Sequence, residues 1–315
     1  MNTNKMNVFA GNTLERLHNL RTKSEEISAI LRSPKARFVP FFQTKPLLTT
    51  ASKKDGMRQI SWLKYDQIQN NISSYNQDEF ILLGEKNNEY YFAVEALKEN
   101  NTLTTAEYYG IREAALYLPH EEAAILAQGK ALIEWNANHR FCGSCGSPTI
   151  STGGGTKRTC TDHQKKCGKS LYPRTDPVSI MLVTHEDKCL LGRQARWPKG
   201  LFSCLAGFID SAETIEEAVV REVSEEAGVE VDLSSVKYYS SQPWPFLGGQ
   251  IMIGCHAKAK SDNIVVVDSE LEDARWFTKE QAKRGLDGSD PEFKLPPKLA
   301  IAHLLIKAWV EGECD

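Results

Sequence analysis

The sequence predicts an α+β protein with two larger domains joined by a short cysteine-rich segment. The chain has 315 residues, enough for about two domains. Strand-like and helix-like patterns occur along its whole length, and four cysteines lie between residues 142 and 167. With 41% hydrophobic and 25% charged residues, the composition is that of a globular protein. We expect domains at residues 1–138, 139–173 and 174–315.

The charge balance gives no overall attraction to nucleic acid or to an anionic membrane, since 38 basic and 41 acidic side chains leave a net charge of −3. This overall balance does not exclude a local basic groove. We find neither a signal peptide nor a stretch of roughly 18 apolar residues. We therefore expect an intracellular protein without a membrane partner, cytoplasmic rather than secreted. A peroxisomal location is the alternative, although the C-terminal Gly-Glu-Cys-Asp is not a peroxisomal signal.

The first domain is expected to be α+β and shows no visible catalytic chemistry. Residues 12–31 have apolar side chains at mixed helical spacing, and residues 121–135 consist almost entirely of good helix formers. Three strand-like pieces lie between these segments, at residues 60–63, 79–83 and 90–94.

The last domain begins with a predicted β-hairpin formed by residues 177–183 and 188–193. Two helices are expected after it, at residues 214–227 and 298–310. The other expected strands are at residues 201–209, 236–242, 250–259 and 275–277.

The cysteine-rich segment resembles a zinc ribbon, in which two pairs of thiolates hold a tetrahedral ion. Cys142 and Cys145 form a CxxC pair with glycines that let backbone amides turn towards the sulfurs. Cys160 and Cys167 are separated by more than the usual two to four residues, and His163 lies in this gap, where it could replace a cysteine. The expected ion is structural Zn²⁺. The alternative is four free thiols, as suits a reducing compartment.

The stretch SQPWPF at residues 241–246 places a tryptophan between two prolines. Proline fixes φ and cannot donate to a sheet ladder, so residues 243–245 should not form a central strand. We expect a stiff loop that presents Trp244 and Phe246, with a strand resuming at Ile251. The alternative is a turn whose aromatic side chains are buried in the core.

The helix at residues 214–227 should begin with a capping box of Thr214 and Glu217 and end at Gly228. Its buried stripe should consist of Ile215, Ala218, Val219 and Val223.

Three carboxylates share one face of this helix, since Glu222, Glu225 and Glu226 stand at positions i, i+3 and i+4. Like charges at this spacing repel. A divalent cation would turn the repulsion into binding, and oxygen ligands suit Mg²⁺ or Mn²⁺. The alternative is a solvated acidic face.

Residues 207–229 match the Nudix signature, Gly-x5-Glu-x7-Arg-Glu-U-x-Glu-Glu-x-Gly-U with U aliphatic, at every fixed position. The chain therefore resembles the Nudix family. This resemblance implies an α/β/α sandwich around a mixed sheet, and hydrolysis of a nucleoside diphosphate linked to another moiety. It also implies that metal ions position and activate a water, that Arg221 orients a metal-binding glutamate, and that Glu213 supports the loop. The expected catalytic residues are Arg221, Glu222, Glu225 and Glu226, and which group is the general base stays open.

SQPWPF together with the cysteine ribbon resembles the NADH pyrophosphatase branch of this family, which includes enzymes that remove NAD caps from RNA. Further matches lie at residues 171–177, 204–208, 272–277 and 296–303, and residues 9–12 resemble the start of a degenerate Nudix-like N-terminal domain. The implied reaction is hydrolysis of NAD(H) to NMN(H) and AMP, with NAD-capped RNA as a further substrate. The alternatives are ADP-ribose or dinucleoside polyphosphates as substrates, or a non-catalytic NAD(H)- or RNA-binding protein.

The resemblance also implies the site residues and a homodimer, in which the second subunit completes the nicotinamide slot. Phe208 and Trp244 would sandwich the nicotinamide ring. The implied Mg²⁺ or Mn²⁺ ligands are Ala206, through its carbonyl, Glu222, Glu225, Glu226 and Glu270. The implied substrate-binding residues are Tyr172, Ala206, Gly207, Phe208, Glu222, Glu226, Gln242, Trp244, Glu270 and Ala302.

The chain departs from the branch at Leu247-Gly248-Gly249-Gln250, which lacks the third proline and the serine of the SQPWPFP-x-S motif. Two glycines make a looser loop, which costs more entropy to order. Their backbone amides could instead bind a phosphate. The preferred substrate and the physiological metal therefore stay open.

Overall fold

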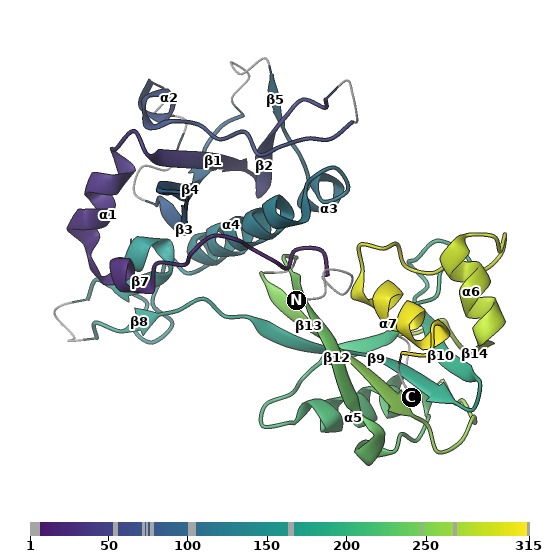
Figure 1. Ribbon diagram of the computed structural model, residues 1–315. Helices are drawn as coiled ribbons and strands as arrows, with labels where there is room; N and C mark the ends of the chain where they lie inside the picture. Colours follow the sequence, from purple (N-terminus) through teal and green to yellow (C-terminus); the bar gives the residue numbers. More distant parts are fainter. Residues whose placement is uncertain are drawn as a thin grey trace. The chain divides into compact units, whose positions relative to one another are not determined.

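The computed structural model describes residues 7–52, 56–70, 73, 75, 79–99, 105–162, 167–246, 248–266 and 270–313. The chain forms two compact units (Figure 1). The first unit comprises Met1–Val8, Asp176–Trp244 and Gln250–Asp315, and the second comprises Phe9–Thr175 and Pro245–Gly249. His163 and Leu247, which the sequence analysis singled out, lie outside the described residues.

The second unit contains a five-stranded sheet in the order β3-β4-β1-β2-β5, in which β1 and β4 run parallel. The long helix α4 packs on β3 and β4, as Figure 1 shows. The strands are β1 (Ala36–Phe42), β2 (Lys45–Thr49), β3 (Ile81–Lys86), β4 (Glu89–Ala96) and β5 (Ala106–Tyr108). The helices are η2 (His18–Thr22), α1 (Ser24–Leu31), α2 (Tyr65–Asn70), α3 (Ile111–Ala114) and α4 (His120–Asn138).

Most of the expected elements of this unit are confirmed. The helix predicted at residues 121–135 lies within α4. The strand predicted at residues 60–63 is wrong, because Ile60 and Leu63 form only isolated bridges, to Leu48 and Phe38. Their side chains are nevertheless buried, which explains the strand-like apolar pattern.

The cysteine segment forms a small three-stranded sheet in the order β6-β7-β8, and it belongs to the second unit. Arg158 on β7 is almost fully buried and donates to Glu79 at 2.6 Å, to Thr149 at 2.8 Å and to Asn136 at 3.1 Å. A buried guanidinium needs such partners, so these bonds tie the ribbon to the end of α4 and to the start of β3. The elements are β6 (Thr149–Thr152), η4 (Gly153–Gly155), β7 (Lys157–Cys160) and β8 (Ser170–Leu171).

The first unit contains a mixed sheet in the order β12-β13-β9-β10-β14, with β11 paired to β9. Strands β13 and β9 run parallel, and the other pairs are antiparallel. The strands are β9 (Asp176–His185), β10 (Lys188–Arg193), β11 (Leu205–Phe208), β12 (Lys237–Trp244), β13 (Gln250–Lys258) and β14 (Asp273–Thr278). The helices are α5 (Ile215–Ala227), η5 (Leu233–Ser235), α6 (Lys279–Asp287) and α7 (Ile301–Val310).

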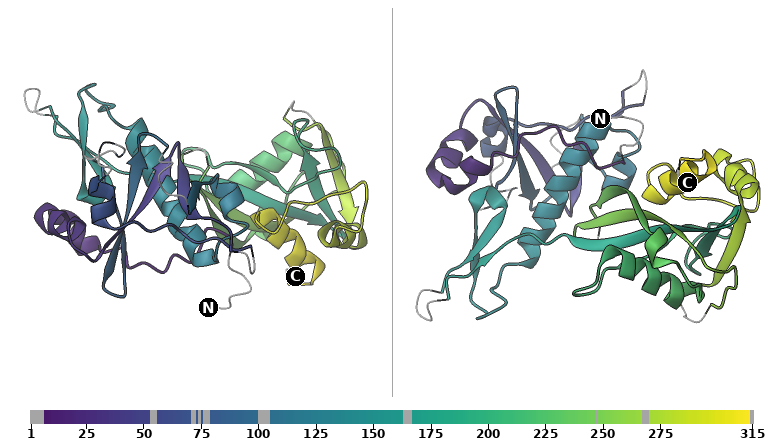
Figure 2. Two further views of the ribbon diagram at one scale, coloured as in Figure 1. Left: turned by 90° about the horizontal axis from the view of Figure 1, so that it is seen from above. Right: turned by 60° about the horizontal axis from the view of Figure 1, so that its bottom comes forward.

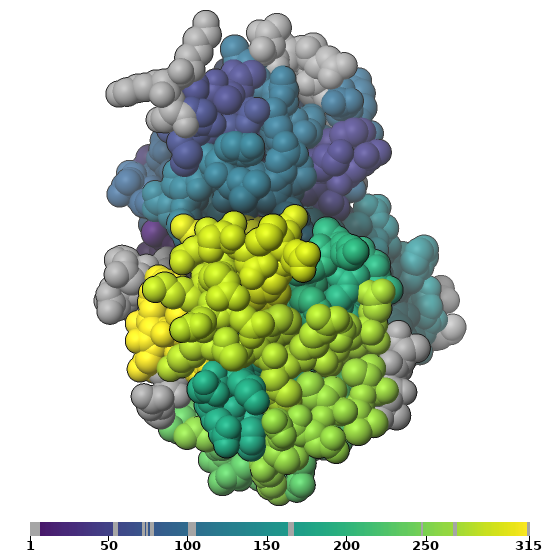
Figure 3. All heavy atoms as spheres, turned by 90° about the vertical axis from the view of Figure 1, so that its right-hand side faces the viewer, coloured from purple at the N-terminus to yellow at the C-terminus, as the bar shows by residue number. Residues whose placement is uncertain are grey.

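Helices cover both faces of this sheet, so the α/β/α sandwich is confirmed (Figure 2). Side chains alternate along a strand, and on β9 Ile180 and Leu182 belong to the core under α6 and α7. Met181 and Val183 belong to the core under α5. In Figure 3 the segment from α6 to α7, coloured lime to yellow, forms an outer surface of this unit. None of the helices in the described part of the chain combines the length and apolar character needed to cross a lipid bilayer.

Three expectations for this unit need correction. Strand β12 continues through Pro243 and Trp244, so the predicted loop is confined to residues 245–249. Because β12 is an edge strand, the missing N–H of Pro243 costs no ladder hydrogen bond. The predicted strand at residues 201–209 begins only at Leu205, and α6 was missed although Thr278 and Gln281 form a capping box.

The signature helix α5 begins and ends as predicted. Thr214 accepts a hydrogen bond from the backbone N–H of Glu217, whose carboxylate accepts one from the backbone N–H of Thr214. Gly228 adopts the left-handed conformation at φ 64°. Of the expected stripe, Ala218, Val219 and Val223 are fully buried, and Ile215 packs against them while partly exposed.

We expect Gly228→Ala to destabilise the protein more than the matched change Gly288→Ala. Both glycines end a helix in the left-handed conformation, where alanine costs about 1–2 kcal/mol. A Cβ on Gly228 would lie 2.6 Å from the Val265 carbonyl oxygen, whereas one on Gly288 would meet no atom within 4 Å. Urea unfolding midpoints of the two variants measure the difference. Equal midpoints would show that the Val265 contact is unimportant.

Candidate active site

Arg221 organises the carboxylates of the signature. Its guanidinium donates to both oxygens of Glu213, at 2.7 and 2.8 Å, and to Glu222 at 2.8 Å and Glu225 at 3.0 Å. It also donates to the Phe208 carbonyl at 2.9 Å. These bonds fix the loop after β11 against the second turn of α5, and they offset part of the repulsion between the carboxylates.

The pKa values of two carboxyl groups reflect this arrangement. The hydrogen bonds from Arg221 hold the pKa of Glu213 at about 2, so this group stays ionised. Burial raises the pKa of Glu222, and the neighbouring Glu225 and Glu270 raise it further, although Arg221 opposes the rise. Glu222 therefore lies where negative charge is concentrated, and a bound cation would stabilise its ionised form.

Gly207 gives Glu222 the room it occupies. A Cβ on Gly207 would lie 1.9 Å from the Glu222 carboxyl carbon, so no side chain fits here without moving the glutamate. The requirement is purely steric, because Gly207 is in an ordinary strand of the sheet, paired with Ser179. The first glycine of the signature thus sets the position of its central carboxylate.

The expected metal ligands line one cleft of about 910 Å³ in the first unit. Glu226 is buried, Glu222 is partly buried, and Glu225 and Glu270 are exposed. A set of carboxylate and carbonyl oxygens suits a hard divalent cation. The lining residues are Val178, Gln194, Ala195, Arg196, Trp197, Ala206, Gly207, Phe208, Asp210, Glu222, Glu225, Glu226, Trp244, Gln250, Met252 and Glu270.

A smaller, mainly apolar recess of about 220 Å³ has lining residues in common with this cleft, among them Trp197, Ala206 and Trp244. It brings in Gln242 and Ala302, both expected in the substrate pocket. Phe208 lies in the cleft with about half of its surface exposed, so its ring is free to stack on a flat ligand.

Gln242 lines the recess, but its amide is engaged with the backbone. The side chain is fully buried, its Nε2 donates to the carbonyls of Val8 at 3.1 Å and Leu299 at 2.7 Å, and its Oε1 accepts from the N–H of Ile301 at 2.9 Å. The N-cap residue Ala300 provides no side-chain cap for α7, so Gln242 supplies one from the neighbouring strand. Its contribution to the pocket is to hold the start of α7 in place.

Two aromatic residues that the sequence singles out, Phe246 of the expected loop and Tyr172 of the expected substrate site, are not in the cleft lining. Phe246 belongs to the second unit, where its ring contacts Phe9 edge-on at 5.9 Å and lies 4.7 Å from the Arg112 guanidinium. Of the two aromatic side chains that the loop was expected to present, only Trp244 lines the cleft, and it does so from the end of β12 rather than from a loop. Tyr172 also belongs to the second unit and is 63% exposed.

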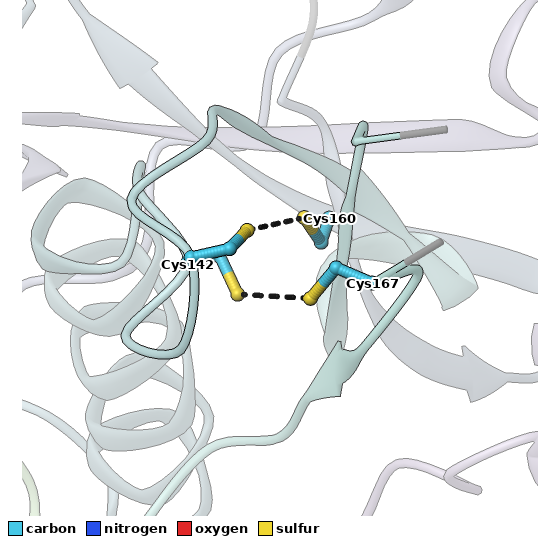
Figure 4. A group of neighbouring side chains, drawn as sticks. Cys142, Cys160 and Cys167 are labelled. Carbon is cyan, nitrogen blue, oxygen red and sulfur yellow. Dashed lines mark hydrogen bonds between the residues drawn. The ribbon is translucent and has the colours of Figure 1, made fainter. Parts of the chain in front are cut away.

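The four ribbon cysteines converge, and their sulfurs all lie within 4.8 Å of one another (Figure 4). Cys142 is 3.8 Å from Cys167, and Cys145 is 3.5 Å from Cys160. Backbone amides of the first knuckle lower the pKa of Cys142, and bonds from Ser147 lower that of Cys145 to about 6. The thiolate is the metal-binding form of cysteine. Backbone N–H groups also bond Cys160 and Cys167, but burial and the neighbouring thiols outweigh them, and the pKa values of both are raised. The convergence of four sulfurs is compatible with a tetrahedral structural ion.

Two family models match the chain. The NUDIX domain matches residues 173–295, and the NADH pyrophosphatase-like rudimentary NUDIX domain matches residues 35–135. The human NAD-capped RNA hydrolase NUDT12 is 37% identical over 96% of this chain and 73% of its own length. The chain belongs to the Nudix hydrolase family. Within the family it lies in the NADH pyrophosphatase and NAD-capped RNA hydrolase branch.

Two further relatives of this Nudix hydrolase are also named for the hydrolysis of NAD(P)H or of NAD-capped RNA. The human NAD(P)H pyrophosphatase NUDT13, mitochondrial, is 41% identical over 68% of this chain and 62% of its own length. The NAD-capped RNA hydrolase NudC of Pseudomonas aeruginosa is 37% identical over 64% of this chain and 66% of its own length. Both the predicted family and its degenerate N-terminal domain are thus confirmed.

Gln194, Trp197 and Met252 line the cleft of this Nudix hydrolase, although no sequence motif predicted them there. Trp197 had a detectable signal, because QARWPKG places an aromatic residue in a Pro- and Gly-containing loop between two strands, much as SQPWPF does. Met252 had none, since one residue within a strand gives no indication of which face borders a cavity.

We expect Gly207→Ala to lower the Mn²⁺ affinity of this Nudix hydrolase by about 10- to 100-fold. The added methyl would displace Glu222, and disturbing a group that orients a ligand typically costs that much. Isothermal titration calorimetry of the purified chain measures the affinity. Gly110→Ala is the control, because a Cβ there meets no atom within 4 Å. An unchanged affinity would show that Glu222 is not a ligand.

Proposed function

We propose that this Nudix hydrolase cleaves the diphosphate bond of NAD(H), giving NMN(H) and AMP, and that it also removes NAD caps from RNA 5′ ends. The observation that carries the proposal is one cleft in which Glu222, Glu226 and Glu270 lie with the exposed ring of Phe208 and with Trp244. The names of the relatives from human and Pseudomonas aeruginosa support the same substrates.

Glu222, Glu225, Glu226, Glu270 and the Ala206 carbonyl would hold Mg²⁺ or Mn²⁺ in this proposal. When bound, such ions neutralise diphosphate charge and lower the pKa of water. Arg221 holds Glu222 and Glu225 in place and does not contact the substrate. A glutamate of this group accepts a proton from the attacking water. The water oxygen forms the new bond to one phosphorus, and the bridging oxygen leaves with the other phosphate.

Substrate recognition would come from the aromatic and apolar parts of the site. Phe208 and Trp244 offer faces to the nicotinamide ring, and Ala302 leaves the recess open for it. We propose a homodimer in which the exposed Tyr172 completes the slot of the partner subunit. We also propose that the chain consists of a Nudix-like domain at residues 1–138, a zinc ribbon at residues 139–173 and a catalytic Nudix domain at residues 174–315.

We expect Glu226→Gln to abolish most of the NADH hydrolysis, because metal-ion stabilisation supplies several kcal/mol, or about 10²- to 10³-fold in kcat. Release of AMP from NADH, NAD⁺ and ADP-ribose should be compared with release of NMN from NAD-capped RNA, whose adenosine remains on the RNA as a 5′-monophosphate end. Glu216→Gln is the matched control, since Glu216 is exposed in the first turn of α5 and does not line the cleft. The function would be refuted if the wild type released neither AMP from NAD(H) nor NMN from capped RNA. A higher kcat/KM for ADP-ribose would favour that substrate instead.

We propose that the ribbon cysteines bind a structural Zn²⁺, because four thiolates leave no open position on a tetrahedral ion. Cysteines that bind a metal instead of forming disulfides are typical of a reducing compartment, and this supports an intracellular, cytoplasmic location.

Cys145→Ser should reduce the zinc content of the purified chain from one ion to almost none, because a hydroxyl is a poor replacement for a thiolate. Elemental analysis measures the content, and Glu226→Gln, which leaves the ribbon intact, should retain its zinc. A zinc content that survives Cys145→Ser would contradict the proposed ligand set.

A further inference from the structure

The loop of residues 194–200, between β10 and β11, is held firmly at both ends. Arg193 forms an ion pair with Glu272 at 2.5 Å and also donates to the Pro198 carbonyl at 3.0 Å. At the other end the Gly200 carbonyl accepts from the N–H of Lys294 at 2.8 Å. A Cβ on Gly200 would lie 2.0 Å from the Glu292 carbonyl oxygen, so the two segments are in close contact. The loop therefore holds its side chains in a defined place.

Arg196, on this loop, is the one cation among the described residues that line the cleft. Its side chain is exposed, and its Nε donates to the Gln194 amide oxygen at 2.9 Å. Within the described chain Arg196 has no ion pair, although five carboxylates line the same cleft. Arg221, by contrast, pairs with two of these carboxylates, Glu222 and Glu225, and with Glu213. The remaining N–H groups of Arg196 are therefore free for an anionic ligand.

The neighbouring Trp197 lines both the cleft and the recess, so the loop reaches the junction of the two cavities. In the proposed function the nicotinamide ring occupies the recess. Arg196 lines the cleft and not the recess, so it is placed beside the AMP half of the substrate rather than beside the nicotinamide half. Without Arg196, the five carboxylates of the cleft would repel a further phosphate group there, because no other described residue of the lining is a cation. The guanidinium can bind such a phosphate through two parallel N–H groups.

We propose that Arg196 forms a second phosphate subsite, for a phosphate on the ribose of the AMP half of the substrate, outside the diphosphate that is hydrolysed. The proposal rests on the proposed function for the position of the AMP half. This phosphate has two chemical sources. In NADP(H) it is the 2′-phosphate, and in NAD-capped RNA it is the 3′-linked phosphodiester. In either case Arg196 favours substrates that have a third phosphate.

The test is ligand binding, which does not depend on turnover. Isothermal titration calorimetry with Mg²⁺ compares AMP, adenosine 2′,5′-bisphosphate and adenosine 3′,5′-bisphosphate. We expect the wild type to bind one of the bisphosphates about 10-fold more tightly than AMP, as befits a charged hydrogen bond. Arg196→Ala should remove that advantage and change the affinity for AMP less than about twofold. It should also reduce the slope of log affinity for the bisphosphate against log salt concentration by about one, as expected for the loss of one phosphate contact. The bisphosphate that is preferred identifies the source.

Lys199→Ala is the matched control, because Lys199 is an exposed cation of the same loop that does not line the cleft. It should bind all three ligands as the wild type does. The proposal is overturned if the wild type prefers neither bisphosphate, if Arg196→Ala weakens AMP equally, or if Lys199→Ala has the same effect. Wild-type hydrolysis of NADH and of NAD-capped RNA, measured alongside, tests the proposed function separately. Its absence for both substrates would refute that function and leave the bisphosphate comparison valid.

Discussion

The set of hydrogen bonds from Arg221 is the interaction on which the rest of the site depends. Clustered carboxylates repel one another, and the helix that bears them would be destabilised without compensation. One guanidinium contacts Glu213, Glu222 and Glu225, and it also fixes the loop after β11 through the Phe208 carbonyl. Loop and helix are thereby joined beside the carboxylates of the proposed metal site. Gly207 completes the arrangement by leaving space for Glu222.

The mixed sheet supports this arrangement because β9 is buried on both faces. Its alternate side chains pack under α5 on one face and under α6 and α7 on the other. Strands β11 and β13 both pair with β9, so Phe208 and Met252 reach the cleft from the two neighbours of one strand. Gln242, on the edge strand, then holds the start of α7, where Ala302 borders the recess.

The cysteine ribbon of the second unit is held together by a different kind of contact, although the rest of that unit has an apolar core. The ribbon has few apolar residues, and a buried arginine and a group of four thiols take the place of a larger core. Arg158 satisfies Glu79, Thr149 and Asn136 together, so removing any partner would leave a buried polar group unpaired. Metal binding by the thiolates would stabilise the ribbon further.

The sequence by itself determined what depends on local order along the chain. The caps of α5, the shared face of its glutamates and the CxxC pair follow from spacing within one or two turns, so each could be predicted from neighbouring residues. Only the tertiary structure decided what depends on distant partners. Pro243 is tolerated because β12 is an edge strand, Cys160 and Cys167 converge despite their wide spacing, and Trp197 enters the cleft. Which face of a segment borders a cavity is set by residues far along the chain, and no local pattern encodes them.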